Sequence, residues 1–397
     1  IRVGDNVADR ERTDLVMVGR NMEKQVADDA VNAMRLFQHY YGPCAVERMR
    51  VGEILPRHGG AFPGQMSLCI DSWIKPDKWG VERVFRAHEI AHQWWGVEVG
   101  HETYHDRWLC EGLCEYSALM YLQAAEGNDK FLDRVREYRD DIYTIRGFMA
   151  ASGEEFGPIA LGDRTESVTR VQDFEADKAD EQQTSLTSSR DQTATRTQTG
   201  PNTDYEDFQT LHPTEFSPDM SQARLKNVKR DAKFNLAIDK KAALVFHMLR
   251  NMLIDFTTMN EDAFFNMMRE FYQSNRGRNV NTADFQALVE KYVGYEMDWF
   301  FEQWLYRDEL PTYEFSYEIL ADEEGGFKAV CHIKTEGVPE DFMAVIPLEI
   351  EIDSKRKAYI RTYVDQLDYE FTLPGLPEKP KRLRLNPFES VLAKVKQ

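Results

Sequence analysis

Residues 88–92 read His-Glu-Ile-Ala-His, and after eighteen intervening residues Glu111 stands inside the stretch Trp-Leu-Cys-Glu-Gly at 108–112. Residues four apart lie on one face of an α-helix, so His88 and His92 can offer imidazole nitrogens to a single metal ion. Glu111 supplies a carboxylate that completes a set of three metal ligands. These two short segments are the strongest indication in the sequence of its fold and its chemistry.

The residues around the two segments favour helices. Apolar residues recur at helical spacing from 81 to 95, no proline interrupts them, and Gly96 provides a helix stop. A second helix is predicted from Trp108 to about Ala125, with Glu111 near its first turn. The sequence thus predicts two helices that bring the three ligands together.

Two histidines and one carboxylate form a ligand set that zinc uses in catalysis. Such a site keeps a fourth position for water and lowers the pKa of that water to about 7. Glu89 falls beside the same helix face, where it can take the proton as general base. We therefore expect one Zn²⁺ ion, held by His88, His92 and Glu111, in a hydrolase that uses metal-activated water.

A second HExxH pattern follows at 101–105, His-Glu-Thr-Tyr-His, and both copies cannot be the catalytic site. A glycine precedes it, its central Thr and Tyr favour extended backbone, and few residues remain before the next helix. Without a helix, its two histidines do not converge. A di-iron site built from one Glu-x-x-His of each copy fails for the same reason, and it lacks the further carboxylate-bearing helices of such proteins.

The zinc motif resembles the gluzincin aminopeptidases, the family of aminopeptidase N and leukotriene hydrolase. The resemblance runs ungapped from His88 to Tyr116, and weaker matches occur at 157–159, 241–250 and 301–305. Together these matches cover most of residues 80 to 310. The resemblance implies a thermolysin-like, mainly helical peptidase domain that binds zinc and cleaves peptides as an aminopeptidase.

Two positions depart from that family. The family has a tyrosine two residues before a lysine; this chain has Asp239 before Lys241, and a carboxyl group can donate to an oxyanion only when protonated. The family's glutamate-bearing strand, which holds the substrate's free amine, corresponds to residues 59–66, where no acid lies. Gly60 and Ala61 are the substrate-binding candidates on this strand. We expect slow turnover and no strict preference for a free N-terminus.

Apolar periodicity predicts the remaining elements. Further helices are expected at 22–41, with an apolar stripe from Val26 to Phe37, and at 129–149, 236–256, 260–273, 282–292 and 297–306. Two short strands are expected at 46–55 and 65–73. From 311 onward the period changes to two, which predicts strands at 313–319, 327–333, 345–352, 359–364, 369–373 and 382–385.

The fold class expected from these elements is α+β, in two domains. Residues 1–310 form the peptidase domain, within which the polar stretch 171–222 is a flexible insertion, either a solvated loop or a lid over the cleft. Residues 311–397 form a small β-sandwich. Because the chain opens at Ile1, we expect a fragment or processed product. The expected location is a soluble domain, either cytoplasmic or part of a larger membrane-tethered protein, since gluzincin domains that this chain resembles also occur joined to membrane permeases.

The composition limits the classes of molecule that the chain is expected to bind. At 397 residues and 42% hydrophobic, the chain can bury a full core, and its net charge of −19 disfavours nucleic acid and anionic membranes. Peptides are the expected partner. No apolar run reaches about 18 residues, the length that a membrane span needs. The five cysteines, including Cys110 and Cys114 beside Glu111, are expected to stay reduced and to pack in the core.

Two classes of function fit these residues. The first is zinc-dependent hydrolysis of peptide bonds by an aminopeptidase-like metallopeptidase with Glu89 as general base. The second is a catalytically weak or inactive zinc-containing module that binds or scaffolds other molecules, which Asp239 and the missing amine anchor favour. Peptide cleavage that depends on both zinc and Glu89 distinguishes the two.

Overall fold

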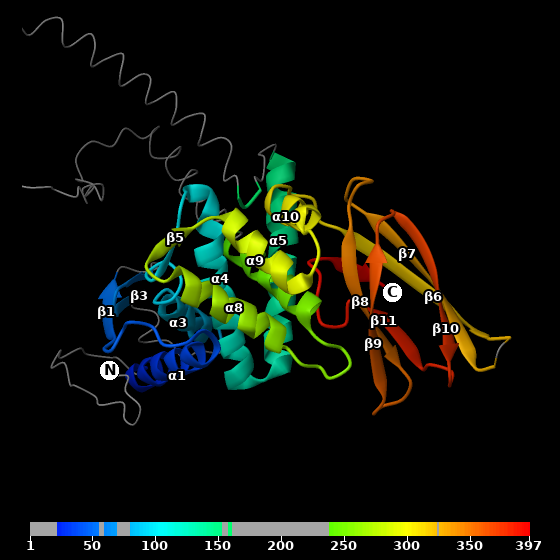
Figure 1. Cartoon of the computed structure of the whole chain (residues 1–397), viewed down its shortest axis with the longest axis horizontal. Helices are drawn as coiled ribbons and strands as arrows, with labels where there is room; N and C mark the ends of the chain where they lie inside the picture. Colours follow the sequence, from blue (N-terminus) through cyan, green and yellow to red (C-terminus); the bar gives the residue numbers. More distant parts are fainter. Residues whose placement is uncertain (1–21, 55–58, 70–79, 153–157, 161–237, 324) are drawn as a thin grey trace, which may run out of the picture. The chain divides into compact units, whose positions relative to one another are not determined.

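The structure is a computed structural model of the chain (Figure 1). It describes residues 22–54, 59–69, 80–152, 158–160, 238–323 and 325–397. All of these belong to one compact unit that combines helices with sheets, which is consistent with the expected α+β class. The insertion predicted at 171–222 lies outside the described residues.

Helix α1 (Glu23–Tyr41) is the amphipathic helix predicted at 22–41. Its apolar stripe is at most 1% exposed: Val26, Ala30, Ala33, Met34 and Phe37. Phe37 meets Trp94 edge to face, with 5.7 Å between ring centroids, and so packs α1 against the segment that follows the first histidine pair. Tyr40 stacks on Phe265 of helix α8 (Asp262–Asn275).

A three-stranded sheet follows α1. Its strands β1 (Arg50–Ile54), β2 (Gly59–Phe62) and β3 (Gln65–Cys69) lie in the order β1-β3-β2, with β1 parallel and β2 antiparallel to β3. The Gln93 side chain accepts a hydrogen bond from the Gly64 amide at 2.9 Å and donates one to the Phe62 carbonyl at 3.1 Å. These bonds tie the edge strand β2 to the segment that follows His92.

Consecutive helices α3 (Val81–Ala91), α4 (Arg107–Glu126) and α5 (Asn128–Ser152) carry the two segments of the zinc motif and the helix after them. α3 ends at Ala91, four residues before the predicted end at 95. The chain turns there because Trp94 enters the core, where its indole nitrogen donates to the Gly42 carbonyl at 2.9 Å.

A further helix is described over residues 238–253. It approaches α4 most closely at Gly112, where an added Cβ atom would lie 2.5 Å from the Ala242 Cβ and 2.9 Å from the Phe246 ring. Real Cβ atoms do not come that close, so only glycine fits this crossing. One turn away, Trp108 stacks on the same phenylalanine ring, with 5.4 Å between centroids.

Helices α8, α9 (Thr282–Val293) and α10 (Asp298–Leu305) match the predicted ranges to within a few residues. The parallel pair β4 (Val99–His101) and β5 (Arg278–Val280) links the segment after α3 to the turn between α8 and α9. Within the described part of the chain, no helix has the length and apolar character needed to cross a membrane.

The C-terminal residues form two sheets, coloured from gold to red in Figure 1. One has the order β10-β7-β6-β12, and the other has the order β11-β8-β9. All pairs are antiparallel except β12 with β6. Six strands correspond to the six predicted ones, and β12 is an addition: β6 (Thr312–Ala321), β7 (Phe327–Glu336), β8 (Ala344–Glu351), β9 (Lys357–Val364), β10 (Asp368–Leu376), β11 (Arg382–Leu385) and β12 (Lys394–Lys396).

Polar contacts join these sheets to the helices. Glu389 pairs with Arg136 at 2.8 Å and with Arg139 at 2.6 Å, both on α5. The Arg361 guanidinium of β9 donates to the carbonyls of Asn251 and Ile254, where the 238–253 helix ends, at 2.8 and 2.6 Å. The division into a domain up to residue 310 and a β-sandwich beyond it stays a prediction.

Candidate metal centre

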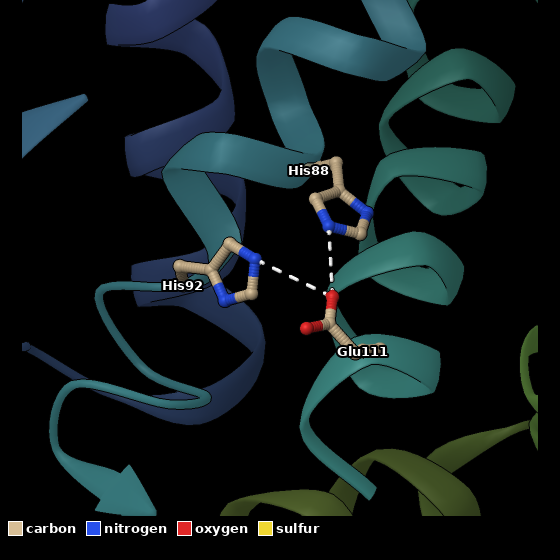
Figure 2. A group of neighbouring side chains, drawn as sticks. All are labelled: His88, His92 and Glu111. Atoms are coloured by element: carbon tan, nitrogen blue, oxygen red, sulfur yellow. Dashed lines mark ion pairs between the residues drawn. The ribbon is translucent and has the colours of Figure 1, made fainter. Parts of the chain in front are cut away.

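The backbone of α3 sets the direction of the two histidines. His88 and Glu89 lie in the last turns of the helix, and His92 is its C-cap residue, with φ −55° and ψ −20°. Because this backbone is still right-handed helical, His92 keeps the face that the four-residue spacing predicts. Figure 2 shows both imidazoles directed toward Glu111, which reaches them from the first turns of the neighbouring α4.

The three ligand atoms converge. Glu111 Oε2 lies 3.4 Å from His88 Nε2 and 3.7 Å from His92 Nε2, and the three residues form a cluster whose ligand atoms all lie within 4.8 Å of one another. Zinc bonds of 2.0–2.1 Å in tetrahedral geometry place ligand atoms about 3.4 Å apart. The two distances to Glu111 therefore fit a metal ion of this size.

The other ring nitrogens are already engaged. His88 Nδ1 lies 2.7 Å from Glu115 Oε2, and His92 Nδ1 lies 3.0 Å from the Trp95 carbonyl oxygen. Both acceptors favour a proton on Nδ1, so in each neutral imidazole the lone pair available to a metal is that of Nε2. The donor set thus suits a metal ion in chemistry as well as in spacing.

Burial and neighbouring charge shift the protonation of these groups. Burial lowers the pKa of His88, but hydrogen bonds to Glu111 and Glu115 outweigh it, and the net pKa lies well above its usual range. Burial and the charge of His88 lower the pKa of His92 to about 4. Burial raises the pKa of Glu111, yet the two histidines hold it well below its ordinary value. Positive charge is therefore favoured where the three side chains meet.

Glu89 has the properties of a proton acceptor. Its side chain is buried, and its Oε2 finds no hydrogen-bond partner among the described residues. Burial raises the pKa of Glu89 to about 7, with His88 opposing the shift and the charges of Glu111 and Glu115 adding to it. A carboxyl group of that pKa exchanges protons readily near neutral pH.

The three proposed ligands and Glu89 line a cavity of about 700 Å³. Gly60 and Ala61, the substrate-binding candidates of strand β2, line it, and so does Asp239. Asp239 Oδ1 is buried and has no hydrogen-bond partner in the described part of the chain, and burial followed by the charge of Glu111 raises the pKa of this group to about 7. In its protonated form Asp239 can donate a hydrogen bond into the cavity.

Several groups at the cavity were not found from the sequence. The Glu115 carboxylate contacts His88, and no motif in the sequence indicates this contact. Helix α5 adds Arg134, Glu137 and Tyr138, which belong to no motif and come from more than twenty residues further along the chain. Cys110 and Cys114 are buried as predicted, and the Cys114 thiol lies 3.2 Å from His92 Nδ1.

The second HExxH pattern has a different backbone. His101 ends strand β4, and Tyr104–Asp106 form a short 3-10 helix, so the expectation that 101–105 lacks a continuous helix is confirmed. His105 Nδ1 lies 2.8 Å from the Ala160 carbonyl. Neither histidine of this copy belongs to a metal-binding cluster in the described residues.

No protein family model matches the sequence. Among solved structures, the chain is similar to the crystal structure of Legionella pneumophila aminopeptidase A in complex with aspartic acid, with a TM-score of 0.59 and 16% sequence identity. The two share a fold. The similarity covers 95% of this chain but only 35% of that protein, so the chain spans little more than a third of its length.

Proposed function

We propose that this chain is a zinc-dependent peptidase of the gluzincin type, with a thermolysin-like peptidase domain. The observation that carries the proposal is the convergence of three ligand atoms beside the buried carboxylate of Glu89, one oxygen of which has no partner among the described residues. The fold shared with an aminopeptidase supports a peptidase over other metal-dependent hydrolases. One zinc ion would be held by His88, His92 and Glu111.

The protein's own residues divide the chemistry among them. Zinc, when bound, supplies a Lewis acid that activates water and polarises the scissile carbonyl. Glu89 accepts a proton from the attacking water and returns it to the leaving amine. Asp239, at the position of the family's tyrosine, donates a hydrogen bond from its protonated form to the substrate oxygen. Glu115 and the Trp95 carbonyl keep the two imidazoles in the tautomer that a metal requires.

The edge strand β2 gives the substrate a place along the cavity. Gly60 and Ala61 line it without charge, and no acidic side chain lies between residues 59 and 66 to hold a free amine. An aminopeptidase needs such a carboxylate to select the N-terminus. We therefore propose aminopeptidase-like cleavage without a strict requirement for a free amino group.

A mixed peptide library with free and acetylated N-termini tests the proposal. Cleavage is expected with zinc present, lost with a chelator and restored by zinc, and reduced about 10²- to 10⁴-fold by Glu89→Gln at unchanged zinc content. Comparable cleavage of acetylated peptides supports the relaxed end preference. No cleavage from zinc-loaded protein would instead favour the second candidate, a zinc-containing binding module, which the aspartate at position 239 motivates.

A further inference from the structure

Three side chains from three helices form a continuous hydrogen-bonded row behind the metal centre. The Tyr138 hydroxyl of α5 donates to Glu115 Oε1 of α4, and Glu115 Oε2 accepts from His88 Nδ1 of α3 at 2.7 Å. Tyr138 is 5% exposed and the Glu115 side chain is 12% exposed. In the proposed reaction, neither Tyr138 nor Glu115 contacts the substrate.

Both oxygens of the Glu115 carboxylate are used by this row. A buried carboxylate is costly unless its oxygens are hydrogen-bonded and its charge is opposed. Here one oxygen meets His88 and the other meets the Tyr138 hydroxyl, while the Lys240 ammonium lies 4.8 Å from the centre of the Tyr138 ring. Both carboxylate oxygens are therefore held in place by groups of two other helices.

The other histidine has no such support. His92 Nδ1 contacts the neutral Trp95 carbonyl and the Cys114 thiol, and that thiol also donates to the same carbonyl at 3.4 Å. A carboxylate acceptor fixes an imidazole more firmly than a carbonyl does, because the hydrogen bond is charge-assisted, and it makes the opposite nitrogen more basic. The two imidazoles are thus held by acceptors of unequal strength.

We propose that Glu115 and Tyr138 are positioning residues that orient His88 and set the affinity of the centre for its metal. Tyr138 fixes the rotamer of the glutamate, and the glutamate fixes the tautomer and the ring plane of His88. This inference rests on the proposed function, since it presumes a metal at His88, His92 and Glu111.

Metal affinity, measured by competition with a chromophoric chelator, is the main test. Glu115→Gln keeps the shape but removes the charge, and zinc dissociation constants are expected to rise about 10- to 100-fold. Tyr138→Phe removes one oxygen and preserves the ring, so a smaller rise, of several-fold, is expected. When both changes are combined, the loss should be less than the product of the single losses, because the hydroxyl acts through the carboxylate.

The chain offers a matched control in Glu98 and Tyr272. Glu98 is a similarly buried glutamate, with a side chain 11% exposed, that accepts from the Tyr272 hydroxyl at 2.7 Å but touches no proposed ligand. Glu98→Gln and Tyr272→Phe are expected to lower stability and leave zinc affinity unchanged. A general effect of losing a buried carboxylate would appear in both pairs.

The ¹⁵N and ¹H resonances of the imidazoles provide a second reading on metal-free protein. The Nδ1 proton of His88 should be observed in the wild type and shifted in Glu115→Gln, while that of His92 is unchanged. Zinc affinity of Glu115→Gln equal to wild type, or equally weakened in Glu98→Gln, would overturn the positioning role. Wild-type protein that binds no zinc would overturn the proposed function, and the metal-directed role with it.

Discussion

The two HExxH segments of this chain, at 88–92 and 101–105, have the same residue pattern and opposite structures. The first lies in a helix, and its imidazoles converge on Glu111 within 4.8 Å. The second crosses from a strand into a short 3-10 helix, and its histidines belong to no metal-binding cluster in the described residues. The pattern marks a metal site only where the backbone repeats every 3.6 residues.

The contacts around the two HExxH segments also differ. Around the first, acceptors meet the ring nitrogens that face away from Glu111, and one oxygen of Glu89 has no partner in the part of the chain that the structure describes. Around the second, Thr103 and Asp106 form a capping box, and Asp106 accepts from the Thr282 amide at the start of α9. The first copy could hold a metal ion, and the second copy joins its own segment to helix α9.

The largest difference between the two copies is expected in zinc affinity when a histidine of each copy is removed. His92→Ala removes one of three protein ligands, and a third of a zinc-binding free energy of about 10–16 kcal/mol corresponds to a loss on the order of a thousandfold. His105→Ala should leave zinc affinity unchanged. Chelator competition and metal content of the dialysed proteins measure both. Equal losses in the two variants would contradict the assignment of the first copy.

The next largest effect is expected in the pH dependence of stability, which should differ between Glu89 of the first segment and Glu102 of the second. Glu89 has a pKa of about 7 in the fold against an ordinary value of 4.5, so its neutral form is favoured and its ionised form destabilises the folded state by roughly 3 kcal/mol. The metal-free wild type should therefore lose stability relative to Glu89→Gln as pH rises from 4.5 through 7, and the difference should vanish below 4.5.

Denaturant unfolding at pH 4 and pH 8 measures this difference. Glu102→Gln, the same change in the second copy, is the control: Glu102 is exposed, and a change within about 0.5 kcal/mol is expected at both pH values. A stability gain for Glu89→Gln that is equal at both pH values would show that Glu89 ionises as an ordinary carboxyl group does.

The smallest expected effect belongs to the joining role of the second copy. Thr103→Ala removes the hydrogen bond from the Thr103 hydroxyl to Asp106 Oδ2, which measures 2.6 Å. Stability should fall by about 1 kcal/mol with zinc affinity unchanged. Thermal unfolding together with chelator competition checks both, and a loss of zinc binding would link this segment to the metal centre.

The sequence predicted the local features well. The apolar pattern located α1, α4 and α9, and the alternation of apolar residues located six strands of the C-terminal sheets. The convergence of His88, His92 and Glu111 could be predicted because their spacing is set by one helix and a short connection. The rejection of the second copy followed from its Gly, Thr and Tyr residues, whose preferences act within a few positions.

The features that could not be predicted from the sequence depend on contacts between residues far apart in the chain. Strand β12 pairs with β6 across 82 positions, as its Lys394–Thr312 register shows, and its three residues have no pattern of their own. Glu115 and Tyr138 meet because α4 and α5 pack together, and neither belongs to a motif. α3 ended earlier than its apolar pattern predicted, because Trp94 is buried from a turn rather than from a helix.

The close crossing at Gly112 carries a consequence for every ligand variant of this centre. Glu111 is the preceding residue, and α4 can lie where it does only because Ala242 and Phe246 meet no side chain at position 112. Gly112→Ala would displace α4 relative to Ala242 and Phe246 and so change the distances from Glu111 to the histidines, with all three proposed ligands still present. The distances within the candidate metal centre thus depend on position 112 carrying a hydrogen where every other amino acid has a Cβ atom.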